Sequence, residues 1–234
     1  MNKKRIDNCI FSNWYPVFKH VTFKSYIIKP LSQEFISYLN SDGIVLPANG
    51  DSTTRHEIQE LSDDSESESS LVAEAPFFPE LQDQIDELID RLGGIAFIKL
   101  NWSSPKDASW MMYDTSLKCR NASDVFLLLK SSDFIAHDLS HAYDVCDDSH
   151  HAMVPDHFEL VLREWCNLSP ATQFRCFVRR NTLIAVSARD TANFYAFVVQ
   201  QHSEIRECIL NFFIEHIQDR FPDADCKKIV SFYR

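Results

Sequence analysis

The sequence predicts an α+β fold in which an antiparallel sheet is flanked by helices, and two observations carry this prediction. Residues 158–190 contain three short runs with the two-residue alternation of β-strands, separated by turn-forming residues. Residues 79–92 and 191–221 instead place apolar side chains at helical spacing. With 234 residues, 45% hydrophobic and 12% aromatic, the chain can bury one sizeable core or two small lobes.

The net charge of −11 is concentrated in one stretch. Residues 51–90 hold thirteen acids and one base, so the rest of the chain is close to neutral. This pattern argues against a broad nucleic-acid-binding surface. The seven cysteines are scattered without a C-x-x-C spacing, which is typical of reduced thiols in the cytosol or nucleus. The sequence contains no long apolar run, so we expect neither secretion nor membrane insertion.

Residues 1–47 are predicted to form a strand and a helix that pack on the main body. Residues 10–18 are rich in aromatic side chains, and residues 21–28 are predicted to form a strand. Ser32 then offers an N-cap for a short helix that Gly43 stops.

Residues 48–75 combine acids and serines with no aromatic side chain, and are therefore predicted to be a disordered, dispensable loop. The serines beside acids, such as Ser62, Ser65 and Ser67, would suit phosphorylation. A plain solvated linker is the simpler interpretation.

A helix is predicted from Pro79 to the glycine pair at 93–94, followed by a compact strand at 95–100. The strand carries one charge, Lys99. Its ammonium group either reaches water from a sheet edge or faces an anion, and the nearby Lys106 favours the anion.

Three short elements are predicted next: a strand at 110–113, a helix capped by Ser123 and a helix starting near Ser132. The histidine-rich stretch that follows allows two interpretations. His137 and His141 have a spacing that would suit zinc on a helix, but no second tight ligand pair accompanies them. A polar surface loop is favoured over a metal site.

The strands predicted at 158–165, 173–179 and 183–188 are the centre of the fold. To bury the apolar even-numbered side chains of the last two strands on one face, a three-residue loop at 180–182 is required. It pairs Phe174 with Ala188 and Cys176 with Val186.

The other face of this hairpin then carries Gln173, Arg175 and Arg189, and Arg163 joins them if the first strand is a neighbour. Clustered arginines suit a phosphate or carboxylate ligand. The alternative is that they pair with Glu159, Glu164 or Asp190 on a solvated face. The four glycines form no phosphate-binding loop, so charged side chains would have to hold any nucleotide phosphates.

Six motifs occur in the order FSNWYP, GIAFIKLNWSSPKDASW, LKCRNASDVFLLLKSSDFI, FELVLREWC, FRCFV and SARD. Together with the acidic loop they resemble the eukaryotic cell division cycle protein 123 family over almost the whole chain. The resemblance implies a bilobed, ATP-grasp-like fold with lobes at 76–157 and 158–234. It implies a cytoplasmic protein that binds ATP with magnesium. It also implies an assembly chaperone for eukaryotic translation initiation factor 2 that engages the gamma subunit, with a role in translation initiation and cell cycle progression.

The resemblance also implies the nucleotide contacts. The phosphate-side lysine corresponds to Lys99, and the strand at 163–166 would pass the adenine. The complete set is Lys99, Trp102, Ser104, Lys106, Arg163, Glu164, Trp165, Cys166, Gln173, Arg175 and Arg189.

The sequence departs from the family at its end. ATP-grasp magnesium sites use an acid on one late strand and Asp-x-Asn on the next, and residues 227–232 do not resemble the first of these. We therefore expect a truncated chain that lacks the final magnesium-binding strand, carries no metal ligand, and binds ATP weakly with little magnesium dependence.

Three functions remain open. An ATP-binding chaperone without turnover is favoured, and we expect a monomer with no nucleic-acid or membrane partner. An ATP-grasp ligase joining a carboxylate to an amine would need metal-held phosphates beside its reacting groups. A binding-only scaffold that has lost ATP is the third possibility.

Overall fold

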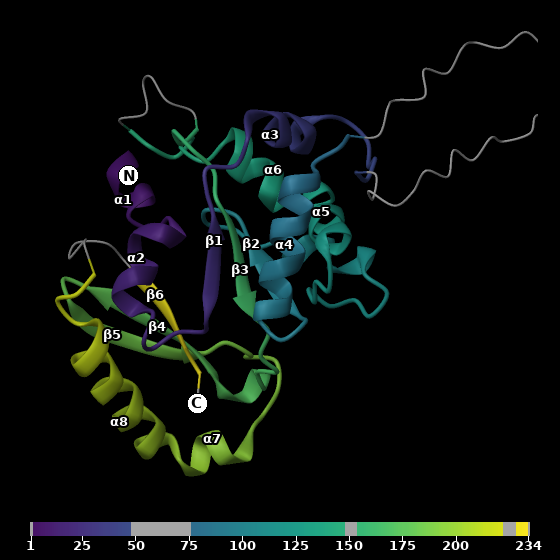
Figure 1. Cartoon of the computed structure of the whole chain (residues 1–234). Helices are drawn as coiled ribbons and strands as arrows, with labels where there is room; N and C mark the ends of the chain where they lie inside the picture. Colours follow the sequence, from purple (N-terminus) through teal and green to yellow (C-terminus); the bar gives the residue numbers. More distant parts are fainter. Residues whose placement is uncertain (1, 48–75, 148–153, 222–227, 234) are drawn as a thin grey trace, which may run out of the picture.

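A computed structural model describes residues 2–47, 76–147, 154–221 and 228–233 (Figure 1). The predicted acidic loop and its candidate phosphorylation sites lie outside these residues. The described chain forms two three-stranded antiparallel sheets, each packed against helices (Figure 1). A mixed fold of helices and antiparallel sheets is therefore confirmed. No helix in the described ranges is long and apolar enough to cross a membrane.

The first sheet has the order β1-β3-β2. Its strands are β1 (Ser25–Ile28), β2 (Ala96–Lys99) and β3 (Leu160–Glu164). Ile98, Leu160 and Leu162 bury one face of this sheet in the main core. The strand predicted at 21–28 is shorter than expected, because the residues before Ser25 form the turn that leaves the preceding helix.

Helices lie on both sides of the first sheet (Figure 1). The core side is covered by α3 (Gln33–Asn40), α4 (Pro79–Arg91), α5 (Ala122–Lys130) and α6 (Asp133–Ser140). The other side is covered by α1 (Lys3–Asp7) and α2 (Phe11–Phe18). The sheet therefore has one apolar face and one face that is free to carry polar side chains.

The N-caps predicted at Ser32 and Ser132 are confirmed, whereas other helix boundaries differ. α3 ends at Asn40, before Gly43, and the helical stretch predicted from 191 begins at Ala196. Ser32 and Ser132 accept hydrogen bonds as the N-caps of α3 and α6, and Gly93 leaves α4 in a left-handed conformation, with φ of +90°. The N-cap of α5 is Asn121 rather than Ser123. The Asn121 side chain accepts the N–H of Asp124, so the helix starts two residues earlier than predicted.

The strand predicted at 110–113 is wrong, because this segment belongs to the 3₁₀ helix η1 (Lys106–Met111) and the turn after it. Local turns satisfy the backbone here, with the Met112 N–H donating to the carbonyl of Ser109. A four-residue strand needs a partner strand for its backbone groups, and none pairs with this segment in the described chain.

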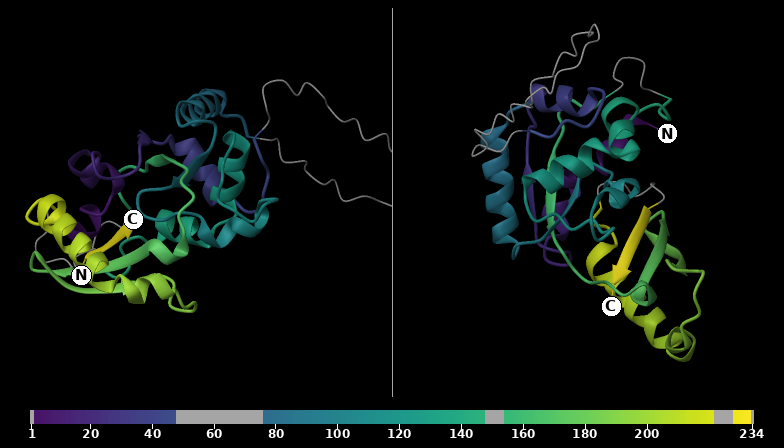
Figure 2. Two further views of the ribbon diagram at one scale, coloured as in Figure 1. Left: turned by 90° about the horizontal axis from the view of Figure 1, so that it is seen from below. Right: turned by 90° about the vertical axis from the view of Figure 1, so that its right-hand side faces the viewer.

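The second sheet has the order β5-β4-β6. Its strands are β4 (Gln173–Arg179), β5 (Thr182–Ala188) and β6 (Lys228–Tyr233), and β6 was not predicted. The other elements of this part are the turn η2 (Pro170–Thr172), α7 (Ala196–Gln200), α8 (His202–Phe212) and the π-helical turn η3 (Phe213–Ile217). Phe174 and Cys176 of β4 pack against Ile205 and Ile209 of α8. Figure 2 shows this smaller unit beside the larger one.

The predicted hairpin register is confirmed in its outer half, where Phe174 pairs with Ala188 and Cys176 with Val186. The three-residue loop is wrong. The turn has two residues, Arg180 and Asn181, both with positive φ, as a type I′ turn requires. A bulge between Phe177 and Val178 shifts the pairing by one residue, which reconciles the short turn with the outer register.

The predicted burial of β5 is also wrong. Ile184 is 60% exposed and Val186 is 40% exposed. The buried side chains of α8 contact β4 instead, so the α8 face of β5 is only partly covered.

Candidate functional site

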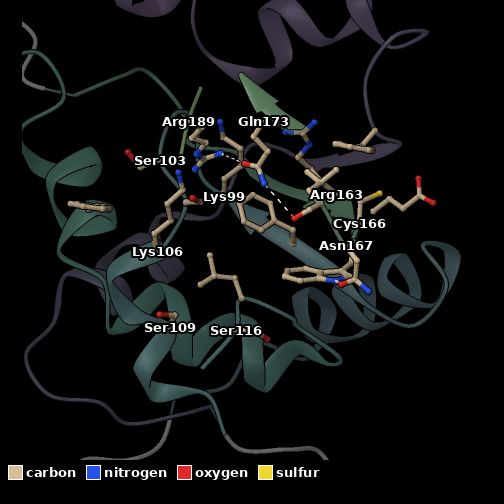
Figure 3. A pocket seen from close by; sticks show the side chains of 18 of the residues that line it. Lys99, Ser103, Lys106, Ser109, Ser116, Arg163, Cys166, Asn167, Gln173 and Arg189 are labelled. Atoms are coloured by element: carbon tan, nitrogen blue, oxygen red, sulfur yellow. Dashed lines mark hydrogen bonds between the residues drawn. The ribbon is translucent and has the colours of Figure 1, made fainter. Parts of the chain in front are cut away.

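A cavity of about 1300 Å³ lies where the two sheets face each other (Figure 3). Its walls come from β2 and the loop after it, from β3, from the linker between the sheets, and from the hairpin of the second sheet. The predicted site residues that line it are Lys99, Trp102, Ser104, Lys106, Arg163, Glu164, Trp165, Cys166, Gln173 and Arg189. Arg175 is the one predicted residue that does not line it.

Strand alternation places two cations on the polar face of the first sheet. Phe97 pairs with Arg163 and Lys99 pairs with Val161, so Phe97, Lys99 and Arg163 share one face. The intervening residues, such as Ile98, point into the core. Lys99 and Arg163 are therefore diagonal neighbours on adjacent strands.

Lys99 faces the cavity rather than open water. Burial, and then repulsion from the Arg163 guanidinium, lowers the pKa of its ammonium group to about 8. The Asp138 and Glu159 carboxylates oppose this change, and Lys106 adds to it. β2 is an edge strand, but a lysine that extended from the edge into water would keep a pKa close to its ordinary value.

A second group of cations forms where Lys106 of η1 faces Arg189, which directly follows β5. Figure 3 shows the ends of Lys106 and Arg189 close together on one wall. Burial, followed by repulsion from Arg189 and Arg175, lowers the pKa of Lys106. Arg175 thus contributes charge without lining the cavity. Arg163 does not join these arginines within one sheet, as the sequence had suggested, because it lies on the other sheet and faces the same cavity.

Gln173 fixes the orientation of Arg189. Nη1 of Arg189 donates to Oε1 of Gln173 at 3.0 Å, and Nε2 of Gln173 donates to the Leu168 carbonyl at 3.4 Å (Figure 3). The alternative that acids neutralise the arginines is weakened, because two of those acids bind elsewhere. Glu159 accepts from the Ser12 N–H, and Asp190 accepts from the Tyr195 hydroxyl.

Apolar side chains line the side of the cavity near the linker between the sheets. Phe97, Leu117 and Trp165 line it, and Nζ of Lys118 lies 5.4 Å from the centroid of the Trp165 ring. Cys166 is a neutral thiol at ordinary pH, because burial raises its pKa. The cavity therefore suits a ligand with a planar apolar part and an anionic part.

The loop after β2 is anchored from several sides. Nε1 of Trp102 donates to the Ile6 carbonyl at 3.0 Å, which ties the loop to α1. Asp107 accepts hydrogen bonds from the Ser132 hydroxyl and the Asp133 N–H, which tie η1 to α6. These contacts fix the backbone that presents Ser104 and Lys106.

The donor set for a metal ion is limited. Glu164 is the one carboxylate among the residues that line the cavity in the described ranges. Within those ranges, no group of three histidine, cysteine, aspartate or glutamate side chains is arranged to hold a metal ion. His137 and His141 lie on and next to α6 with ring centroids 5.9 Å apart, and His150 and His151 are outside the described residues.

Sequence reasoning missed part of the cavity wall. Phe97 could have been found, since it shares strand parity with Lys99. Leu117 and Asn167 also line the cavity, but they lie in segments without regular periodicity and gave no signal.

The chain was compared with known proteins. The D123 family model matches residues 14–233. The Xenopus tropicalis "Translation initiation factor eIF2 assembly protein" is 42% identical over 233 residues, covering 96% of this chain and 69% of that protein. The Yarrowia lipolytica "Cell division cycle protein 123" is 42% identical, covering 96% of this chain and 59% of that protein. This chain thus spans roughly two thirds of these relatives' length. The structure of Cdc123 from Schizosaccharomyces pombe matches all of this chain and 81% of its own, with a TM-score of 0.80 and 36% identity.

Proposed function

Because the chain belongs to the D123 family, the family of cell division cycle protein 123, we propose that it is an ATP-binding assembly chaperone for eukaryotic translation initiation factor 2. The relatives are named for assembly of this factor and for the cell division cycle, which supports a role in translation initiation and cell cycle progression. The proposal includes an ATP-grasp-like architecture and binding to the gamma subunit. It also includes a monomeric state and a cytoplasmic location.

The observation that carries the proposal is the distribution of charge in the cavity. Lys99 and Arg163 approach from the first sheet, and Lys106 and Arg189 lie together on another wall. Such a set of ammonium and guanidinium groups is suited to binding the oxygens of a triphosphate. The apolar side chains of Phe97, Leu117 and Trp165 are suited to packing against the adenine base.

The same geometry supports a role for the nucleotide as a clamp. Lys106 of η1 is repelled by Arg189 and Arg175 of the second sheet's hairpin, and its charge in turn acts on Lys99 of the first sheet. An anion bound between them would replace this repulsion with attraction from both sides. We propose that ATP binding thereby fixes the two sheets relative to each other, so that a single shape is presented to the gamma subunit.

Magnesium, when bound beside a triphosphate, neutralises phosphate charge through hard oxygen ligands. The described cavity wall offers one carboxylate, Glu164, which does not fit a magnesium site by itself. The proposed clamp therefore relies on the lysines and arginines of this chain and on no metal ligand.

Titration calorimetry with ATP and with adenosine tests the nucleotide part of the proposal, and capture of the purified gamma subunit with and without ATP tests the partner. We expect ATP to bind more tightly than adenosine, and Lys99→Ala to weaken both ATP binding and ATP-dependent capture. Release of ADP with a carboxylate and an amine would favour a ligase instead. Capture of the subunit without any ATP binding would favour a scaffold.

A further inference from the structure

The motif FSNWYP at residues 11–16 begins helix α2 and has no role in the site described so far. Its first residue, Phe11, is fully buried. Nζ of Lys99 lies 5.5 Å from the centroid of the Phe11 ring, and Cζ of Arg163 lies 5.4 Å from it. One aromatic ring thus contacts both cations of the first sheet.

Backbone contacts hold Phe11 at this place. Its N–H donates to the carbonyl of Asn101 at 3.1 Å. Asn101 lies two residues after the end of β2. The N–H of Ser12 donates to Oε1 of Glu159 at 2.8 Å, and Glu159 is fully buried. Since the N-cap residue Ile10 makes no side-chain cap bond, the Glu159 carboxylate takes over the capping of α2.

Asn101 and Glu159, which accept hydrogen bonds from the first turn of α2, are also hydrogen-bonded to each other. Asn101 is fully buried, and its Oδ1 accepts the N–H of Glu159 at 2.8 Å. Its Nδ2 donates to the His157 carbonyl at 3.2 Å. The ends of β2 and β3 therefore position α2 through hydrogen bonds that run from the strands to the first turn of the helix.

Neighbouring side chains fix the ring and one of its cations. Tyr15 stacks on Phe11 with centroids 4.9 Å apart, and its hydroxyl accepts the N–H of Ser25 at the start of β1. Cζ of Arg163 also lies 5.7 Å from the Phe23 ring, and its Nη2 donates to Thr22 at 2.9 Å. The Arg163 guanidinium is thus held by side chains of the segment between α2 and β1 as well.

Two like charges at diagonal positions of a sheet are unfavourable, and their burial adds a desolvation cost. The negative face of an aromatic ring offsets both effects without neutralising the cations. A carboxylate in the same place would form ion pairs with them and compete with an incoming anion. Phe11 therefore favours the charged ammonium group of Lys99 beside the Arg163 guanidinium without adding a negative charge to the site.

We propose that α2 is part of the anion site and that Phe11 is a positioning residue, which holds Lys99 and Arg163 together as charged groups that face the cavity. The identity of the anion as a nucleotide phosphate rests on the function proposed above. The arrangement of the ring and the two cations does not.

The test compares Phe11→Leu, which removes the ring and keeps an apolar side chain, with Phe35→Leu. Phe35 is also fully buried, but its ring contacts Tyr38, Phe78 and Phe126 in the main core. Both variants lose an aromatic side chain from a buried position, so a general loss of packing affects both.

The first measurement is the titration of Lys99 by NMR, in protein without ligand. The charged groups that act on it are Arg163 of β3, Lys106 of η1, Asp138 of α6 and Glu159. We expect Phe11→Leu to lower the Lys99 pKa further, by roughly half a unit or more, because the ring favours the charged ammonium. Phe35→Leu should leave the titration unchanged. An unchanged Lys99 titration in Phe11→Leu would overturn the proposal.

A second variant, with pentafluorophenylalanine at position 11, is used if Phe11→Leu does not fold. This side chain keeps the aromatic ring and reverses its electrostatic character. It should lower the Lys99 pKa in the same direction, and an unchanged or higher pKa would again overturn the proposal.

The second measurement is affinity by calorimetry. Phe11→Leu should weaken ATP binding about 3- to 10-fold relative to Phe35→Leu and leave adenosine binding unchanged. If Phe11→Leu weakens ATP binding and adenosine binding equally, Phe11 acts only through general packing and the proposal is overturned. If the unaltered protein binds no ATP, the proposed function fails, and the Lys99 titration still decides the role of Phe11.

Discussion

Asp138 of α6 accepts two hydrogen bonds from Ser103, one from its backbone N–H at 2.8 Å and one from its hydroxyl at 2.9 Å. Ser103 lies in the loop that carries Trp102, Ser104 and Lys106 to the cavity. Asp138 is itself buried. A buried carboxylate on a helix of the main core thus fixes the backbone of the candidate site.

Asp138→Ala is expected to lower the free energy of unfolding by about 1 to 3 kcal/mol, because it leaves the Ser103 N–H without its acceptor. ATP binding should weaken as well, since the loop loses its anchor. Thermal denaturation and calorimetry measure the two effects. Asp133→Ala, at an exposed position of the same helix, is the control and should change both quantities little. Equal effects of the two substitutions would contradict the anchoring role.

Lys99→Ala is expected to weaken ATP binding by about 1.5 to 3 kcal/mol, which is typical of losing a charge-assisted contact. Calorimetric titration measures the change. The matched control is Lys19→Ala, which removes an exposed lysine. If the two variants bind ATP equally well, Lys99 does not contact the phosphates.

The affinity for ATP is expected to fall as the pH rises through about 8. Burial and Arg163 lower the pKa of Lys99 to about 8 in the free protein, so its ammonium group loses its proton above this pH, and anion binding loses a positive charge. The affinity should fall by nearly tenfold per pH unit in the range where Lys99 is neutral in the free protein but charged in the ATP complex. Lys106, whose pKa is also lowered, adds to the effect.

Lys99→Arg is the control for the pH dependence, because a guanidinium stays charged over this range. Its ATP affinity should vary less with pH than that of the unaltered protein. Parallel pH profiles would assign the titration to another group.

ATP binding to this polypeptide is expected to depend little on magnesium, because Glu164 is the one carboxylate lining the described part of the cavity. Calorimetry with and without magnesium, at equal ionic strength, measures the dependence. A large gain in affinity with magnesium would show that further oxygen ligands belong to the site.

The sequence by itself determined those features that depend on neighbouring residues. The N-caps Ser32 and Ser132, the stop of α4 at the glycine pair and the alternation along β4 follow from local geometry. Strand parity also placed Gln173 and Arg189 on one face of the hairpin, and both line the cavity. Lys99 was identified because a charge interrupts an apolar strand.

Only the tertiary structure decided which elements meet, because those contacts join residues far apart in the chain. The segment at 110–113 resembles a strand locally but has no partner strand among the described residues, so it forms a helical turn instead. Val186 has a buried pattern but remains 40% exposed, because the buried side chains of α8 contact β4. Ser12 and Glu159 are 147 positions apart, yet their hydrogen bond helps to hold Phe11 against Lys99 and Arg163. Periodicity reports which face of an element is apolar, whereas the packing of the whole chain determines what covers that face.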